Sequence, residues 1–168
     1  MSIRGKVQPG FTIVELLIVV VVIGILAAIT IVAYNGITAS ANDAHRMADV
    51  DAVKKFMEIY YVENGYYPAS NNILDANAAT ALSSGPLQGL SPEALRGPSA
   101  TASTVSSWGQ WGGDVISAGM DYSYKSFKPD GSGGVQNCTT TTDTCSQFQI
   151  YYKVEADDSY KVITSANQ

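Results

Sequence analysis

Glu15 is the only charged side chain in the apolar stretch of residues 11–42. A lone carboxylate at membrane depth costs roughly 2.5–3.5 kcal/mol on insertion scales. A chain that keeps such a group is therefore expected to gain a partner for it. We expect that partner on another molecule, at the position four residues upstream. The alternative is an incidental glutamate that lies near enough to the membrane edge to reach water.

Few other residues in this chain are of types that do chemistry. Cys138 and Cys145 are the only cysteines, and His45 is the only histidine. In an oxidising compartment the two cysteines could close a small loop, whereas in a cytosolic protein their spacing would carry no meaning. A single histidine is too little for a zinc site of His and Cys ligands. No phosphate-binding glycine loop or G-x-S-x-G motif occurs, so we expect no enzyme, no cofactor and no metal site.

The charge balance disfavours nucleic acid as a partner. The chain has 168 residues and a formal net charge of −5. Basic residues are scattered, and only Lys54 and Lys55 are adjacent. Nucleic-acid binding usually needs a basic patch or stripe, and the composition gives no sign of one.

The apolar stretch itself predicts a membrane span. Residues 11–34 exceed the roughly 20 apolar residues that cross a bilayer, and Arg4 and Lys6 precede them. Basic residues before a span stay in the cytoplasm, so the rest of the chain is expected outside. A secretory signal peptide is the alternative, with Ala27-Ala28 as its cleavage site, but its apolar region would be only about 7–15 residues long.

The start of this span resembles a known family. Residues 10–17 read GFTIVELL and are followed by an uninterrupted apolar run. This pattern is similar to the class III signal of type IV pilins and type II secretion pseudopilins, and residues 65–68 (GYYP) resemble the family at the end of its long helix. The resemblance covers about residues 10–68. Further residues that match the family's usual run are Gly24, Ala27, Ala28, Ala33 and Tyr34.

The resemblance implies a processing site and an assembly contact. A prepilin peptidase would cut between Gly10 and Phe11 and methylate the new N-terminus at Phe11. In the filament, Glu15 would neutralise the Phe11 amine of a neighbouring subunit and so fix the axial register, because a misplaced subunit would bury an unpaired carboxylate. Within one helix, Phe11 and Glu15 are also at i,i+4 spacing and could pair.

Two positions differ from the family's usual pattern. Val32 stands where many members carry a proline, and because valine keeps its N–H we expect a straighter helix. Gln8-Pro9 precedes the glycine, where a basic residue is usual.

The span is expected to continue into a scaffold helix that ends at Asn64, capped by Gly65. Its second half, residues 43–64, is amphipathic and should pack on a sheet. Asp51 and Lys55 are spaced for a well-oriented intrahelical ion pair, and Lys54 and Glu58 for a weaker one in the reversed orientation. The apolar face of this half consists of Val50, Val53, Met57 and Tyr60.

The rest of the chain predicts short helices and then strands. We expect helices at 73–82 and from Pro92 to Gly97, and packing of Trp108 and Trp111 at the sheet edge, or else a surface-adhesive patch. The expected strands are residues 121–128, 148–155 and 160–164. The predicted fold is α+β, a long helix packed on an antiparallel sheet of three or four strands. The predicted segments are a leader (1–10), a transmembrane or filament-core helix (11–42), a scaffold helix (43–64), a connecting region (65–119) and a sheet region (120–168).

The leading functional hypothesis is a structural subunit, a major type IV pilin. The resemblance implies a chain that waits in the bacterial cytoplasmic membrane and is then assembled into an extracellular helical filament for adhesion or motility. Its partners would be copies of itself, the prepilin peptidase and the membrane assembly machinery. A disulfide between Cys138 and Cys145 would then form outside the cell.

Two alternatives stay open at this point, a pseudopilin of a type II secretion system and a minor pilin in DNA uptake or adhesion. Many major pseudopilins carry a calcium site on a late loop. The spacing of the late carboxylates makes no recognised calcium loop; these are Asp130, Asp143, Asp157 and Asp158.

Overall fold

A computed structural model of the chain describes residues 10–73, 75–98, 100, 108–110, 120–140 and 142–167. The chain divides into two compact units, Met1–Thr38 and Ala39–Gln168, which are considered separately. The leader residues 1–9 and Trp111 lie outside the described residues.

The first unit contains the beginning of the long helix α1 (Ile13–Asn64). Its backbone is helical without a break up to Thr38, including Val32, whose N–H a proline would remove. Every side chain from residue 16 to residue 23 is apolar and exposed, so all faces of the helix are apolar. By length and composition α1 can cross a membrane.

In the second unit, α1 packs one face against a sheet. Val50, Val53 and Met57 follow one another on successive turns and are fully buried. The helix ends at Asn64, and Gly65 follows with a φ of +80°. Glycine adopts this left-handed conformation without strain, so the predicted C-terminal cap is confirmed.

The ion pairs predicted between Asp51 and Lys55 and between Lys54 and Glu58 are not formed among the described residues, and both predictions are wrong. Glu58 accepts a hydrogen bond from the Tyr67 hydroxyl at 2.7 Å and another from the Ala166 N–H at 2.9 Å. Its carboxylate thus joins α1 to the following segment and to the end of the chain.

The described part of the connecting region contains η1 (Ser70–Asn72), α2 (Asp75–Ser84) and η2 (Pro92–Leu95). Helix α2 begins and ends slightly later than predicted, because a 3-10 turn precedes it. Pro92 opens η2 as expected. That helix stops before Gly97 because Arg96 has an extended backbone.

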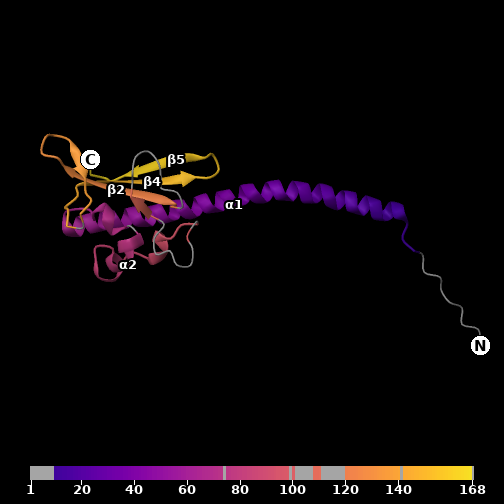
Figure 1. Cartoon of the computed structure of the whole chain (residues 1–168), viewed down its shortest axis with the longest axis horizontal. Coiled ribbons are helices and arrows are strands. Elements are labelled where there is room, and N and C mark those ends of the chain that lie inside the picture. Colours follow the sequence, from indigo (N-terminus) through magenta and orange to yellow (C-terminus); the bar gives the residue numbers. More distant parts are fainter. Residues whose placement is uncertain are drawn as a thin grey trace, which may run out of the picture. The chain divides into compact units, whose positions relative to one another are not determined.

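Among the described residues, the second unit contains a five-stranded sheet with the order β1-β2-β4-β5, and β3 also pairs with β2. The strands are β1 (Trp108–Gln110), β2 (Tyr122–Pro129), β3 (Val135–Asn137), β4 (Gln147–Val154) and β5 (Ser159–Thr164). Strands β2, β4 and β5 are antiparallel, whereas β1 runs parallel to β2. Within this unit, the sheet lies on one side of α1 and α2 on the other (Figure 1).

The predicted α+β fold, a long helix packed on a C-terminal antiparallel sheet, is confirmed except for β1, which runs parallel to β2. The sheet is larger than the predicted three or four strands because β1 and β3 are also present. Each of these strands has three residues, which is too short to show an alternating pattern.

Aromatic side chains fill much of the core between the sheet and α1. Trp108 is fully buried and stacks on Tyr122, with ring centroids 4.6 Å apart. The Trp108 indole N–H donates to the Ala94 carbonyl at 3.2 Å. This tryptophan therefore packs at the sheet edge, as the simpler of the two interpretations of the sequence expects.

Candidate functional site

Thr12 and Glu15 form a reciprocal cap at the start of α1. The backbone N–H of Thr12 donates to the Glu15 carboxylate at 2.8 Å, and the Thr12 hydroxyl donates to the same oxygen at 2.7 Å. The Glu15 N–H in turn approaches the Thr12 hydroxyl oxygen at 3.3 Å. This capping box satisfies two of the N–H groups that every helix start leaves open. The carboxylate in the apolar segment therefore has a partner within its own chain.

Gly10 and Phe11 directly precede this cap. Neither residue is helical, and Phe11 is 85% exposed. The peptide bond of the predicted cleavage site therefore lies in accessible, irregular backbone, the kind of segment that a protease can bind. The pairing of Phe11 with Glu15 expected after cleavage needs a free Phe11 amine, which the chain lacks while Gly10 is attached.

A sequence pattern for the cap was available. Residues 12–15 read TIVE, and threonine followed three residues later by glutamate is the signature of a capping box. The predicted roles of Glu15 rest on its charge alone and do not include Thr12 as its hydrogen-bond donor.

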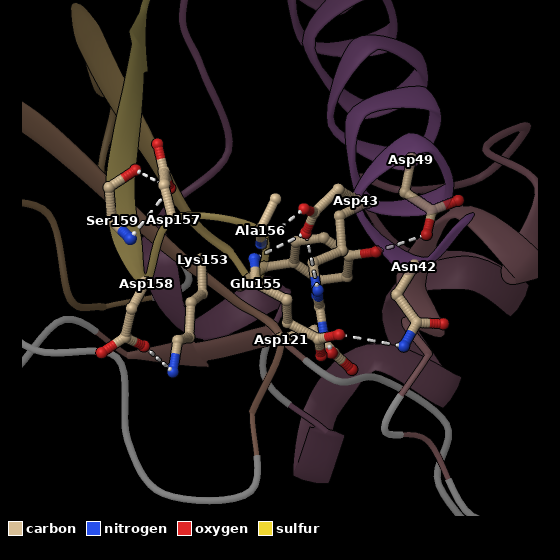
Figure 2. A network of polar contacts seen from close by, with 12 residues as sticks. Asn42, Asp43, Asp49, Asp121, Lys153, Glu155, Ala156, Asp157, Asp158 and Ser159 are labelled. Carbon is tan, nitrogen blue, oxygen red and sulfur yellow. Dashed lines mark hydrogen bonds and ion pairs between the residues drawn. The ribbon is translucent and has the colours of Figure 1, made fainter. Parts of the chain in front are cut away.

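A second polar cluster lies in the second unit and surrounds Arg46 of α1. Figure 2 shows three carboxylates of this cluster, those of Asp43, Asp121 and Glu155. The Arg46 side chain is 4% exposed and contacts three carboxylates. Its guanidinium lies 3.2 Å from Asp43, 3.2 Å from Asp121 and 2.6 Å from Glu155. Because arginine presents several donors in a planar fork, one side chain joins α1 to the start of β2 and the end of β4.

The turn between β4 and β5 is held by the same cluster. Asp43 accepts hydrogen bonds from the N–H of Glu155 at 2.8 Å and from the N–H of Ala156 at 3.0 Å. Asn42 donates to the Glu155 carboxylate at 3.1 Å. Figure 2 shows Asp43, Asn42 and Glu155 turned toward one another. The first α1 turns of the second unit thus anchor the tip of the β4–β5 hairpin.

A buried carboxylate follows one turn later on α1. Asp49 is 7% exposed and accepts a short hydrogen bond from the Tyr122 hydroxyl. His45 lies 3.5 Å from the same carboxylate at the surface. Burial raises the pKa of Asp49, against the opposing effect of the Tyr122 hydrogen bond.

The electrostatics of the Arg46 cluster favour the charged forms. Burial tends to lower the pKa of Arg46, but hydrogen bonds to Glu155 and Asp121 outweigh that effect and raise it. The hydrogen bond from Arg46 lowers the pKa of Glu155, and the one from Asn42 adds to this. Arg46 and Glu155 are therefore ionised in the folded chain at neutral pH.

Cys138 and Cys145 form a disulfide, with Cα atoms 6.1 Å apart and a sequence separation of 7. The carbonyl of Cys145 accepts from the Tyr67 N–H at 2.8 Å, and that of Cys138 accepts from the Ser70 N–H at 3.1 Å. The disulfide loop thus holds the segment that follows α1.

Asp143 lies within this loop and organises it. Its carboxylate pairs with Lys128 at 2.6 Å and accepts the N–H groups of Thr139 and Thr140 at 3.1 Å each. The Lys128 hydrogen bond, followed by those from Thr140, lowers the pKa of Asp143 to about 2. Among the described residues, no three His, Cys, Asp or Glu side chains are grouped so that they could hold a metal.

Residues 5–31 match the family model described as the prokaryotic N-terminal methylation motif. The chain is 33% identical over 76 residues to a fimbrial protein of Neisseria meningitidis, which covers 45% of each chain. It is 36% identical over 67 residues to the type IV major pilin protein PilE of Neisseria gonorrhoeae, 40% of each chain. The chain therefore carries the N-terminal methylation motif of prepilins, and its homologues include type IV pilins.

The chain is also 30% identical over 69 residues to the type II secretion system core protein G of Escherichia coli K12, which covers 41% of this chain and 48% of that protein. The chain thus spans less than half the length of the curated relatives it matches. No solved structure matches it significantly.

Proposed function

We propose that this chain is the major subunit of a type IV pilus. In this proposal the prepilin waits in the bacterial cytoplasmic membrane, where prepilin peptidase cuts it between Gly10 and Phe11 and methylates Phe11. Copies of the processed chain then pass through the assembly machinery into a helical surface filament that serves adhesion or motility.

The observation that carries the proposal is the exposed apolar surface of the first unit. Leu16, Val19 and Ile25 are each more than half exposed, and the same holds on the other faces of the helix. A surface of this kind must be covered by lipid or by protein. A bilayer covers it before assembly, and packing among copies of the same helix covers it in a filament.

The cap at Thr12 explains how the carboxylate enters the membrane before processing. Glu15 already accepts two hydrogen bonds from Thr12, so it is not a bare charge in the apolar segment. Cleavage before Phe11 would create an amine that outcompetes neutral donors, because charge-assisted hydrogen bonds are about twice as strong. A neighbour's amine would then bind Glu15 only at the correct stagger.

The second unit supplies the outward-facing domain in this proposal. Its attachment to α1 through Arg46 and its disulfide at Cys138 suit a domain that works outside the cell, where disulfides persist. The similarity to the secretion protein of Escherichia coli favours a second candidate, a pseudopilin that forms a short filament within a secretion system.

Electron microscopy of sheared surface material distinguishes the two candidates. Cells that express the chain at its normal level should release long thin filaments, and antibody raised against the second unit should label them along their length. Filaments absent from the surface, with the chain retained in the cell envelope, would favour the pseudopilin. Label confined to filament tips would contradict a major subunit.

A further inference from the structure

Two tyrosine rings meet in the second unit where α1 ends. Tyr60 lies near the end of the helix, and Tyr66 follows the turn at Gly65. Their ring centroids are 5.7 Å apart, and the rings meet edge to face at an angle of 80°. The Tyr60 hydroxyl donates a hydrogen bond to the Tyr66 hydroxyl oxygen at 3.3 Å. Both contacts are favourable, so the two rings are held with their hydroxyl ends together.

The contact through the hydroxyl ends determines which atoms of the two rings are close. In a phenol, each ortho carbon is bonded directly to the carbon that carries the hydroxyl. Hydroxyl oxygens 3.3 Å apart therefore bring an ortho carbon of Tyr60 near one of Tyr66. The ortho carbons carry much of the unpaired electron of a phenoxyl radical, and two such radicals join there. Groups that the fold holds together react far faster than groups that must first collide.

The pair is accessible to small molecules from solvent. Both rings are half-buried, and both line a hollow of about 310 Å³ that opens beside them. A small oxidant can therefore reach either hydroxyl. The hollow also gives the Tyr66 ring space to turn from the edge contact toward the offset contact in which a bond between ortho carbons forms.

A second tyrosine pair nearby lacks this access. Tyr61 and Tyr67 stack with ring centroids 4.6 Å apart, but Tyr67 is fully buried. The Tyr67 hydroxyl donates to the Glu58 carboxylate at 2.7 Å, so that end of the ring is turned to a carboxylate. Within the described part of the chain, Tyr60 and Tyr66 are thus the tyrosines that combine access from solvent with contact between their hydroxyl groups.

We propose that Tyr60 and Tyr66 form an intramolecular dityrosine cross-link when the chain meets a one-electron oxidant, such as a peroxidase supplied with hydrogen peroxide. Each phenol gives one electron to the oxidant and one proton to water, and the two phenoxyl radicals join through a C–C bond between ortho carbons. The hydrogens on those two carbons then move as protons to the phenol oxygens, and both rings become aromatic again. The chain loses two hydrogen atoms in total, and one peroxide molecule is reduced to two molecules of water.

The cross-link would add a covalent connection at the end of α1. Tyr67, the residue after Tyr66, already donates its N–H to the Cys145 carbonyl at 2.8 Å. The new bond would therefore join the helix covalently to the segment that the disulfide loop holds. The site uses no residue of the Thr12–Glu15 cap and stands whether or not the chain forms filaments.

Controlled oxidation of the full chain in detergent micelles tests the proposal. The oxidant is a photo-oxidised ruthenium complex, with persulfate as the final electron acceptor, and the product is digested with glutamyl endopeptidase. Cleavage after Glu63 separates Tyr60 from Tyr66. We expect the two resulting peptides to stay joined, with a mass two hydrogen atoms below their sum and with dityrosine fluorescence. The yield should not depend on protein concentration. Oxidation of Tyr160, which is 46% exposed, shows that the oxidant has acted.

Tyr66→Phe and Tyr60→Phe should each lose the link between the two peptides. Phenylalanine keeps the ring but has no hydroxyl hydrogen, so it forms no phenoxyl radical. Tyr61→Phe is the matched control, because it removes a neighbouring hydroxyl on the same helix and leaves the proposed pair intact. That variant should retain the link at the wild-type yield. Wild-type chain unfolded in guanidinium should give a lower yield, since the contact between the rings is then lost.

A link that persists in Tyr66→Phe would overturn the proposal, because it would belong to Tyr61 and Tyr67. Oxidation at Tyr160 without a link between the two peptides would also overturn it. So would a link that forms only between separate chains, which a yield that rises with protein concentration would reveal.

Discussion

Thr12 holds the carboxylate of Glu15 with both its backbone N–H and its hydroxyl, at 2.8 and 2.7 Å. The only acidic residue in the first turn of α1 is thus also the residue that completes the helix cap. An acidic side chain at this position is further favoured by the positive end of the helix dipole. The same contact between Thr12 and Glu15 therefore caps the start of the helix and gives the carboxylate in the apolar segment its hydrogen-bond partner.

Thr12→Val should loosen this start. The change keeps the shape of the side chain but removes the hydroxyl, and loss of an N-cap costs about 1 kcal/mol, or about fivefold in local opening. Amide hydrogen exchange of Glu15 in lipid nanodiscs should therefore quicken about fivefold. Thr30→Val, which removes a hydroxyl bonded to the Ala27 carbonyl within the same helix, is the control. Equal exchange at Glu15 in all three proteins would contradict the cap.

Glu15→Ala should yield a subunit that is cleaved and stable in the membrane but assembles poorly. The reason is that no carboxylate then remains to receive a neighbour's amine at the correct stagger. Cells are sheared and the filament fraction is blotted against the whole-cell amount. Glu63→Ala removes an exposed carboxylate near the other end of α1 and should leave the filament fraction unchanged. Normal surface filaments in Glu15→Ala would contradict the proposal that Glu15 fixes the axial register of neighbouring subunits.

Arg46→Leu should destabilise the second unit by about 3–5 kcal/mol, because it leaves several carboxylates near one another without their cation. Lys153→Met removes a comparable but exposed ion pair, whose side chains are 40% and 83% exposed, and should cost less than about 1 kcal/mol. Denaturant unfolding of the full chain in micelles, followed by near-ultraviolet circular dichroism, compares the two. Equal losses of unfolding free energy in the two variants would show that the Arg46 cluster stabilises the fold no more than an exposed ion pair does.

Acid should weaken the second unit between about pH 4 and pH 2. Hydrogen bonds from Arg46 lower the pKa of Glu155, and those from Lys128 and Thr140 lower the pKa of Asp143 to about 2. Each group then stabilises the fold above its unfolded pKa of about 4, and this is lost as the pH falls through the folded value. Asp49 acts in the opposite sense, since burial raises its pKa.

Asp143→Asn should flatten this acid dependence. The thermal unfolding midpoint is measured from pH 5 to pH 2 in the wild-type chain and the variant. Asp51→Asn serves as the control, because the Asp51 carboxylate has no ion-pair partner within the described residues. Parallel curves for wild type and Asp143→Asn would rule out a stabilising role for the ionised carboxylate.

Much of the fold follows from local patterns. The apolar run, the cap at Gly65 and the β4–β5 hairpin are each specified by neighbouring residues, and the sequence predicts all three. The spacing of Cys138 and Cys145 allows a disulfide, and the prediction that it forms needed only the further expectation of an oxidising compartment. Strands β1 and β3 were not predicted, because a strand of three residues in a glycine-rich or exposed segment is too short to show alternating apolar and polar residues.

The Arg46 cluster could not be predicted in the same way. Asp121 and Glu155 lie 75 and 109 residues from Arg46 along the chain, and only the packing of the sheet on α1 brings them together. Glu58 is the opposite case. A local ion pair with Lys54 was predicted, but the Glu58 carboxylate forms hydrogen bonds with residues farther along the chain. Tertiary contacts decided both cases, and a single sequence contains no signal for them.

The mass of the N-terminal peptide of the surface-exposed protein tests the proposed pilin processing most directly. The filament fraction is digested and the first peptide is sequenced by mass spectrometry. We expect a chain that begins at Phe11 and carries one added methyl group on its amine. A chain that begins at Met1, or at a residue other than Phe11, would contradict processing as a prepilin and with it the pairing of Glu15 to a neighbour's amine.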